Sequence, residues 1–273
     1  MSSITYKTKV AGFRRIVWAH YKKSGRHSLP WRKTHDTYRV LVSEVMLQQT
    51  QVDRVIPLYT NFIKRFPIAA KLAAATLADV LKSWQGLGYN RRAKMLQQAA
   101  KQLAVKKFRT PEELETLPGV GPYTARAVAA FAYGQDGIVI ETNIRTAIIH
   151  HFFPERKEKI SDAEIAEVLT AALPKGKARE WYSALMDYGA HLKRAGISHN
   201  VRTKSYAKQA KFTGSLREVR GAIVRSLATG PQTKRVLQNL FEPERLDQIT
   251  RALAALEKEK LVQKKGARYA LAD

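Results

Sequence analysis

Hydrophobic residues recur along most of this chain at spacings of three and four, which is the period of an α-helix. We therefore expect helices over residues 10–22, 37–65, 76–84, 89–106, 110–116, 122–133, 142–152, 161–172 and 178–190. No stretch of this part shows the alternation of apolar and polar residues that would support a large sheet. The pattern predicts an all-α architecture for the larger part of the chain.

The last sixty residues show a different pattern. Helices are expected over 215–228, 232–240 and 244–259, followed by two short strands around Lys265–Gly266. Three helices and a hairpin are typical of a winged-helix (α+β) module. Residues 175–220 are rich in Lys and Arg, and their middle has no apolar period, as expected for a loop or linker. The sequence predicts two domains, residues 1–210 and 214–273.

A tight turn within the helical part can bind an anion. The predicted helix at 110–116 begins with Thr110 as N-cap, Pro111 in the first helical position and Glu113 completing a capping box. After it, Gly119, Val120 and Gly121 join this helix to the next. Glycines expose backbone N–H groups, and a helix N-terminus favours negative charge, so this turn predicts a phosphate contact. An ordinary helical hairpin with a glycine turn is the alternative.

Composition narrows the class of partner. Of 273 residues, 45% are hydrophobic, and 48 Lys and Arg stand against 23 Asp and Glu, giving a net charge of +25. Such a charge indicates a polyanionic partner: nucleic acid first, an anionic membrane surface second. There is no cysteine, which excludes disulfides and cysteine-ligated metal clusters. No run approaches the roughly 18 apolar residues of a membrane span, so we expect a cytoplasmic protein, associated with the nucleoid if bacterial.

Two acidic residues follow or interrupt apolar runs. On the helix expected at 37–65, Glu44 neighbours Val40, Leu41 and Leu47. Apolar surroundings disfavour the charged form of a carboxyl group, which suits a general acid, although an ion pair at a helix margin is the alternative. Glu141 follows the apolar run Ile138–Ile140. An acid at this point could simply interact with the dipole of the helix that begins after it.

Four motifs occur in an order and spacing that resemble one family. They are "LPWRKTHDTYRVLVSEVMLQQTQVDRVIPLYTNFIKRFP", "WQGLGYNRRAKML", "LPGVGPYTARAVAAFAYG" and "ETNIRT". Over about residues 10–220 the chain resembles the helix-hairpin-helix DNA glycosylases of the MutY type. These enzymes remove adenine opposite 8-oxoguanine or guanine.

The resemblance implies roles for individual residues. Glu44 matches the family's acid that protonates adenine, and Glu141 stands where the family has an Asp that stabilises the sugar cation. The extra methylene moves that carboxylate by about an ångström, and a displacement of this size can cost on the order of a hundredfold in rate. Asn143 matches a family Asn near the same site. Tyr123 stands where bifunctional relatives carry a Schiff-base lysine, which implies base removal without strand cleavage.

The resemblance also implies DNA contacts, and each has a structural alternative. Trp31, Arg32 and Asp187 would line the base pocket, although Trp31 could belong to the core and Asp187 to an ion pair. Gln48, Leu87 and Tyr89 match wedge residues that fill the gap left by a flipped nucleotide. Leu87 and Tyr89 could instead pack the helical core. Phosphate contacts are expected from the Gly119–Gly121 turn, Lys193 and Arg194.

Two features depart from the family. Most members hold an iron–sulfur cluster with four cysteines, where this chain has "HLKRAGISHNVRTKSYAKQ", so no cofactor is expected and packing must stabilise the loop. The winged helix replaces the Nudix-like domain that recognises 8-oxoguanine.

We expect a monofunctional adenine DNA glycosylase that binds damaged or mismatched double-stranded DNA as a monomer. Two alternatives stay open: a glycosylase for another base, such as uracil or thymine opposite guanine, and a non-catalytic lesion binder.

Overall fold

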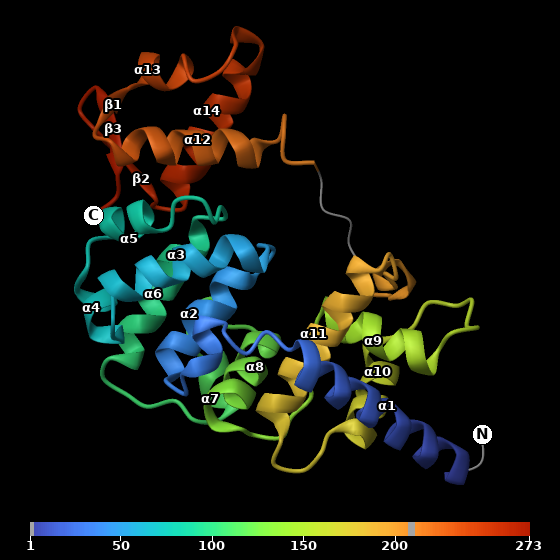
Figure 1. Cartoon of the computed structure of the whole chain (residues 1–273). Coiled ribbons are helices and arrows are strands. Elements are labelled where there is room, and N and C mark those ends of the chain that lie inside the picture. The colour runs from blue at the N-terminus through green and yellow to red at the C-terminus, as the bar shows by residue number, and fades with distance from the viewer. Residues whose placement is uncertain (1–2, 207–210) are drawn as a thin grey trace. The chain divides into compact units, whose positions relative to one another are not determined.

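The computed structural model describes residues 3–206 and 211–273 and is mainly helical, with a small sheet near the C-terminus (Figure 1). The chain forms two compact units, each assembled from separate segments. The first unit comprises Met1–Val40, Arg109–Leu114 and Gly121–Lys208, and the second comprises Leu41–Phe108, Glu115–Val120 and Gln209–Asp273. The predicted end of the first domain, residue 210, lies outside the described residues.

The first unit is built around two long helices and the shorter ones that cover them. Its α-helices are α1 (Ser3–Ser24), α8 (Pro122–Tyr133), α9 (Thr142–Phe152), α10 (Asp162–Ala172) and α11 (Ala178–Arg194), with short 3₁₀ turns η1 (Pro30–Lys33) and η2 (Asn200–Arg202). The core is apolar and aromatic: Phe13 of α1 lies edge-on to Trp181 of α11, and both are buried. Helices α9 and α11 pack together most extensively.

The second unit combines helices from the first half of the chain with the C-terminal module. Its helices are α3 (Val52–Arg65), α4 (Ala69–Ala74), α5 (Leu77–Ser83) and α6 (Arg91–Leu103), with most of α2 (Thr37–Leu47). The C-terminal module, residues 211–273, contains α12 (Leu216–Ala228), β1 (Gln232–Thr233), α13 (Lys234–Gln238), η3 (Pro243–Arg245), α14 (Leu246–Lys258), β2 (Val262–Lys265) and β3 (Arg268–Leu271). The strands form an antiparallel sheet in the order β1-β3-β2, and α12 packs against α5.

These elements confirm the predicted fold class: a helical protein with a small winged-helix module at its C-terminus. The hairpin around Lys265–Gly266 is present, with Gly266 at φ +61° in the turn. The capping box is also present, because Glu113 accepts the Thr110 N–H at 3.3 Å and donates its own N–H to Thr110 Oγ1 at 3.2 Å. It begins α7 (Pro111–Glu115).

The prediction of one helix over 37–65 was wrong. The chain leaves the helix after Leu47, and α3 begins only at Val52. At the break, Gln49 adopts φ +55°, a left-handed conformation that is uncommon outside glycine. Arg92, distant in the sequence, donates to the carbonyl oxygens of Val45 and Gln48 at 2.6 and 2.7 Å. These carbonyls are thus satisfied without a continuing helix.

Other boundaries also moved. Helix α1 begins seven residues before the predicted start at residue 10, and α11 runs four residues beyond the predicted end at 190. Helix α4 was not predicted, because six residues are too few for a periodic pattern. Strand β1 was not predicted either: it has two residues and forms only by pairing with β3.

The cysteine-free loop after α11 is anchored to the first unit by hydrogen bonds. Ile160 and Thr203 form a parallel bridge, in which the Ile160 N–H donates to Arg202 O at 2.8 Å and the Lys204 N–H donates to Ile160 O at 3.0 Å. The Arg202 guanidinium donates to the carbonyls of Phe153 and Arg156, both at 2.6 Å. Thr203 is buried. Backbone and arginine hydrogen bonds therefore hold this loop against the first unit.

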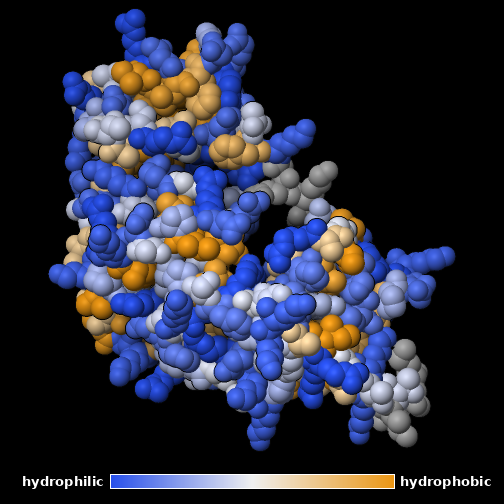
Figure 2. Space-filling view, in the orientation of Figure 1, coloured by the Kyte–Doolittle hydropathy of each residue, from blue (hydrophilic) through white to orange (hydrophobic). Residues whose placement is uncertain are grey.

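Hydrophilic residues cover most of the face seen in Figure 2, as the abundance of Lys and Arg leads one to expect. Among the helices of residues 3–206 and 211–273, none combines the length and the apolar character needed to cross a bilayer.

Candidate active site

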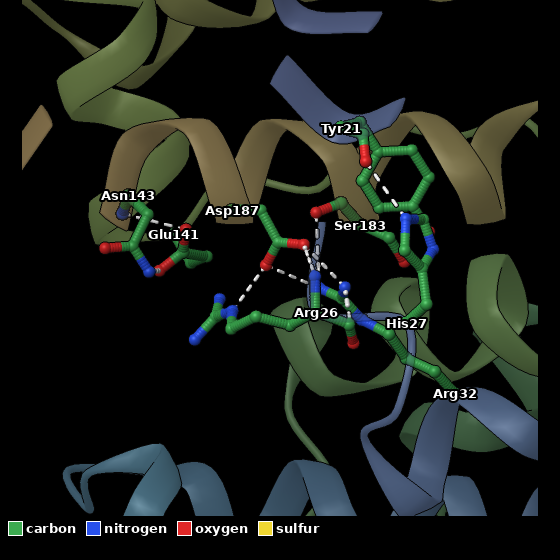
Figure 3. Close-up of polar contacts among 8 residues, drawn as sticks. All are labelled: Tyr21, Arg26, His27, Arg32, Glu141, Asn143, Ser183 and Asp187. Atoms are coloured by element: carbon green, nitrogen blue, oxygen red, sulfur yellow. Dashed lines mark hydrogen bonds and ion pairs between the residues drawn. The ribbon is translucent and has the colours of Figure 1, made fainter. Parts of the chain in front are cut away.

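Glu141 is the N-cap of α9, and its carboxylate closes over the start of its own helix (Figure 3). Its Oε1 accepts the backbone N–H groups of Asn143 and Ile144, both at 2.8 Å. Its Oε2 accepts the Asn143 side-chain amide at 3.1 Å and the Thr142 hydroxyl at 3.2 Å. Backbone donors and the helix dipole both favour a negative charge here. The apolar run before Glu141 and the cap thus fix a half-buried carboxylate in place.

A glycine of α11 lets the first turn of α9 approach closely. A Cβ built on Gly189 would lie 2.0 Å from the carbonyl oxygen of Asn143 and 2.9 Å from its Cα. No side chain fits at that position without moving the backbone. Sequence reasoning missed Gly189, although it stands two residues after Asp187, because a helical glycine in one sequence gives no sign of the strand or helix that approaches it.

Lys193 lies beside the same helix N-terminus. Its Nζ donates to the Thr142 hydroxyl at 3.0 Å. Burial lowers the pKa of Lys193, while the negative charge of Glu141 acts in the opposite direction. Lys193 therefore places a positive charge close to Glu141, whereas its predicted companion Arg194 is exposed.

Asp187 on α11 is held by two arginines (Figure 3). Arg26 donates its backbone N–H at 2.8 Å and its Nε at 2.6 Å, and Arg32 donates through Nη1 at 2.7 Å and Nη2 at 3.0 Å. Asp187 is only 2% exposed. Burial acts to raise the pKa of Asp187, but the hydrogen bonds and charges of Arg32 and Arg26 outweigh it, so the pKa lies below its usual value. The pair Arg32–Asp187 is thus brought together as an ion pair that orders the segment before α2.

The other residues predicted for this region lie on ordered elements. Trp31 is a buried residue of η1, and Tyr123 lies half-buried in the first turn of α8, packed on the apolar core. Arg179 of α11 was not predicted. It donates to the carbonyls of Arg32 and Thr34 at 2.8 and 2.7 Å and so fixes the turn that carries Trp31 and Arg32.

Glu44 belongs to the second unit and is largely buried. It is 7% exposed on α2, and its helical neighbours Val40, Leu41 and Val45 are buried. Of the neighbours predicted for Glu44, Val40 and Leu41 are buried and Leu47 is half-buried.

The predicted wedge residues also lie in the second unit, around Arg92. This arginine was missed, because the sequence shows only one more basic residue in a basic helix. It donates to the carbonyls of Leu87 and Gly88 at 3.1 and 3.3 Å as well as to those of Val45 and Gln48. Burial lowers the pKa of Arg92 to about 10, and the Tyr89 hydroxyl acts to raise it. One guanidinium therefore fixes the end of α2 to the "GLGYN" turn.

That turn presents its residues differently. Leu87 is buried, whereas Tyr89 is 39% exposed and adopts φ +47°. In the helical hairpin, Gly119 has φ +77°, and a Cβ there would lie 2.8 Å from the Cβ of Met95. The positive φ and the short distance are two separate reasons why this position requires glycine. Val120 is buried and Gly121 is the extended N-cap of α8.

The structure thus brings Glu141, Asn143 and Lys193 together, pairs Arg32 with Asp187, and groups Gln48 with Tyr89. Glu44 and Glu141 belong to different compact units. Chemically, the first unit supplies a fixed carboxylate that can stabilise a cation, and the second supplies a buried carboxyl group and an exposed aromatic residue beside basic side chains.

Comparisons with known proteins agree with these features. Residues 42–173 match the model of the HhH-GPD superfamily of base excision DNA repair proteins. The adenine DNA glycosylase of Mycolicibacterium smegmatis is 36% identical over 273 residues, covering 90% of this chain and 92% of that protein. That of Mycobacterium tuberculosis is 38% identical over 195 residues, covering 69% of this chain and 63% of that protein.

Solved structures share the fold. A thermostable thymine-DNA glycosylase superposes with a TM-score of 0.58 at 24% identity, over 67% of this chain and 87% of that one. A trapped endonuclease III–DNA covalent intermediate superposes with a TM-score of 0.56 at 18% identity, over 71% of this chain and 88% of that one. By its close relation to the M. smegmatis enzyme along almost the whole of both chains, the protein belongs to the adenine DNA glycosylase family of the HhH-GPD superfamily.

Proposed function

We propose that this protein is a monofunctional DNA glycosylase that hydrolyses the N-glycosidic bond of an adenine mispaired with guanine or 8-oxoguanine. The observation that carries the proposal is the 36% identity to the M. smegmatis adenine DNA glycosylase over 92% of its length. A net charge of +25 supports double-stranded DNA as the partner. A base inside a duplex is out of reach of any side chain, so the adenine must first be flipped out.

Glu44 is proposed to protonate the leaving adenine. Its match to the family's acid supports this role, and so does its place on α2, where it is only 7% exposed to solvent. Protonation turns adenine into a neutral leaving group when the bond to the sugar breaks. The sugar that remains has oxocarbenium character.

Glu141 is proposed to stabilise that cation. Its two backbone donors hold the carboxylate in place before the reaction, so no reorganisation is needed when positive charge develops. The same N-cap position can hold either Glu, as in this chain, or the family's Asp. A shorter Asp at an N-cap accepts hydrogen bonds from the same helix N–H groups. The proposal requires Glu44 and Glu141 to meet at one flipped nucleoside.

Tyr123 supports a monofunctional reaction. A phenol cannot form a Schiff base with the sugar, and so the proposed product is an intact strand with an abasic site. The proposal needs no metal or cofactor, and the sequence offers no cysteine to ligate a cluster.

The proposal is tested with a panel of labelled duplexes containing A·8-oxoguanine, A·G, T·G and U·G pairs. We expect strand breaks only after alkali and only for the two adenine pairs. Breaks without alkali would contradict the monofunctional assignment, and release of thymine or uracil instead of adenine would contradict the substrate.

The variant Glu44→Gln tests the mechanism. It keeps the shape of the side chain but cannot donate an acidic proton, so we expect at least a thousandfold loss of base release with duplex binding within about threefold of the wild type. Single-turnover rates and fluorescence anisotropy measure the two quantities. Turnover at the wild-type rate would remove Glu44 from the reaction.

A further inference from the structure

Two residues of α11, Gly189 and Lys193, meet the first turn of α9. They lie four residues apart, so they share one face of their helix. Gly189 lets the backbone of Asn143 come so close that its carbonyl oxygen would lie 2.0 Å from an added Cβ. One turn further along, the Lys193 Nζ lies 3.0 Å from the Thr142 hydroxyl oxygen. The close approach of the two helices thus brings an ammonium group to the residue that follows Glu141.

The ammonium group fixes the direction of the Thr142 hydroxyl. In its charged form a lysine side chain has three donors and no acceptor, so the Thr142 oxygen must accept this hydrogen bond. The hydroxyl proton is then left for another partner, and Oε2 of Glu141 lies 3.2 Å away. Lys193, Thr142 and Glu141 therefore form a chain in which each group donates to the next.

This chain ends on the carboxylate oxygen that the helix backbone does not hold. Oε1 of Glu141 accepts the backbone N–H groups of Asn143 and Ile144, both at 2.8 Å, whereas Oε2 accepts side-chain donors. A Glu side chain has one more rotatable bond than Asp, so its carboxylate needs more restraint to keep one orientation. An oriented donor on Oε2 supplies such a restraint.

We propose that Lys193 is a positioning residue for base removal, which orients the Glu141 carboxylate through the Thr142 hydroxyl. The proposal rests on the proposed function, in which Glu141 stabilises the sugar cation. It differs from the phosphate contact that the family resemblance implies for Lys193. A positioning residue changes the rate of the reaction within the bound complex, whereas a phosphate contact changes the affinity for DNA.

The sign of the effect separates positioning from simple electrostatics. The positive charge of Lys193 would by itself oppose the positive charge that develops on the sugar. If charge alone acted, removing it would speed base release. If Lys193 acts by holding the carboxylate in place, removing it slows base release, because a misplaced group loses much of its effect on the transition state.

The test compares rate and affinity in the full-length protein on an A·G duplex. Lys193→Met keeps an unbranched side chain but has no donor. We expect adenine release under single-turnover conditions at saturating enzyme to slow about tenfold, with affinity by fluorescence anisotropy within about threefold of the wild type. Lys177→Met is the matched control, because this exposed lysine at the opposite end of α11 carries the same charge. Its rate should stay within about twofold of the wild type.

Variants of Thr142 test the chain itself. Thr142→Val removes the hydroxyl with little change of shape and should slow release about tenfold, whereas Thr142→Ser restores a hydroxyl and should recover most of that loss. The double variant Lys193→Met/Thr142→Val should be no slower than either single variant, because both act through one hydroxyl group. Thermal midpoints close to that of the wild type confirm that each variant is folded, and the Thr142→Ser recovery does not depend on any variant of Lys193.

Three results would overturn the proposal. The first is a wild-type or faster rate in Lys193→Met, which together with weaker binding would identify a phosphate contact. The second is a double variant whose loss is the product of the two single losses. The third is a Thr142→Ser variant as slow as Thr142→Val. Each of these leaves the proposed function intact, whereas a wild-type protein that releases no adenine would remove the proposed function and this role of Lys193 with it.

Discussion

Among the glycines of the first unit, Gly189 is the one where an added Cβ would lie closest to another atom. The carbonyl oxygen of Asn143 occupies the space where a side chain would begin, 2.0 Å from an added Cβ. The position of α9, which carries Glu141 as its N-cap, therefore requires that residue 189 of α11 has no side chain. The position of α9 and the stability of the protein are linked here, because any side chain at residue 189 displaces the N-terminus of α9.

The variant Gly189→Ala should destabilise the protein by about 1–3 kcal/mol, the usual cost of overpacking. Gly12→Ala is the matched control, since Gly12 is also helical and its Cβ would meet nothing within 4 Å; alanine there should be neutral or stabilising. Chemical denaturation of the three proteins measures the free energies of unfolding. Equal stability of Gly189→Ala and wild type would show that α9 and α11 are not in the contact described.

His151 makes stability depend on pH. Burial, together with the positive charges of His150 and Lys9, lowers the pKa of His151 to about 4 from 6.5, and its Nε2 lies 2.7 Å from the Tyr188 hydroxyl. The unfolded chain therefore binds a proton near pH 6.5 that the folded chain refuses until about pH 4. By linkage, the free energy of unfolding should fall as pH decreases through this window.

The variant His151→Gln removes this titration and keeps a partner for Tyr188. We expect a shallower loss of stability between pH 6.5 and 4 than in the wild type, measured as the free energy of unfolding in denaturant at several pH values. His20 and His199, whose pKa values are also lowered by burial, remain in both proteins and cancel in the comparison. Parallel curves would exclude His151 as a source of the pH dependence.

At the scale of elements, local chemistry was predictable and long-range contacts were not. Thr110 and Glu113 are three residues apart, so their capping box could be read from the chain and was confirmed. The break after Leu47 could not, because the carbonyls of Val45 and Gln48 are satisfied by Arg92, more than forty residues away. For the same reason Glu141 and Asn143 could be proposed as neighbours, whereas Gly189, Arg92 and Arg179 were found only in the structure. The catalytic and DNA-contact roles remain predictions.

Hydrogen bonds to backbone carbonyls help to hold the loop after α11. Arg202 donates to Phe153 O and Arg156 O, and its backbone pairs with Ile160. The variant Arg202→Ala should free this loop, and limited proteolysis should then cut within residues 195–206 several times faster than in the wild type. Arg194→Ala, which removes an exposed arginine at the end of α11, should leave the cleavage rate unchanged. Equal cleavage of all three proteins would mean that the bridge at Thr203 suffices.

At the scale of the whole molecule, charge dominates the expected interaction with DNA. A protein with 48 basic and 23 acidic residues binds a duplex largely by releasing counterions. We expect affinity for an undamaged duplex to fall on the order of a thousandfold between 50 and 200 mM salt, as for proteins with several phosphate contacts. Anisotropy titrations across this range measure the slope. An affinity that is insensitive to salt would contradict electrostatic binding.

The two compact units are interleaved along the chain, which passes from one to the other after Val40, Phe108, Leu114, Val120 and Lys208. Neither unit is therefore a continuous gene fragment. A chain that ends before Lys208 would hold pieces of both units and the whole of neither, so neither unit can complete its packing until synthesis has passed that residue. For anyone dividing this protein for expression, the practical result is that only the C-terminal module offers a contiguous piece to cut.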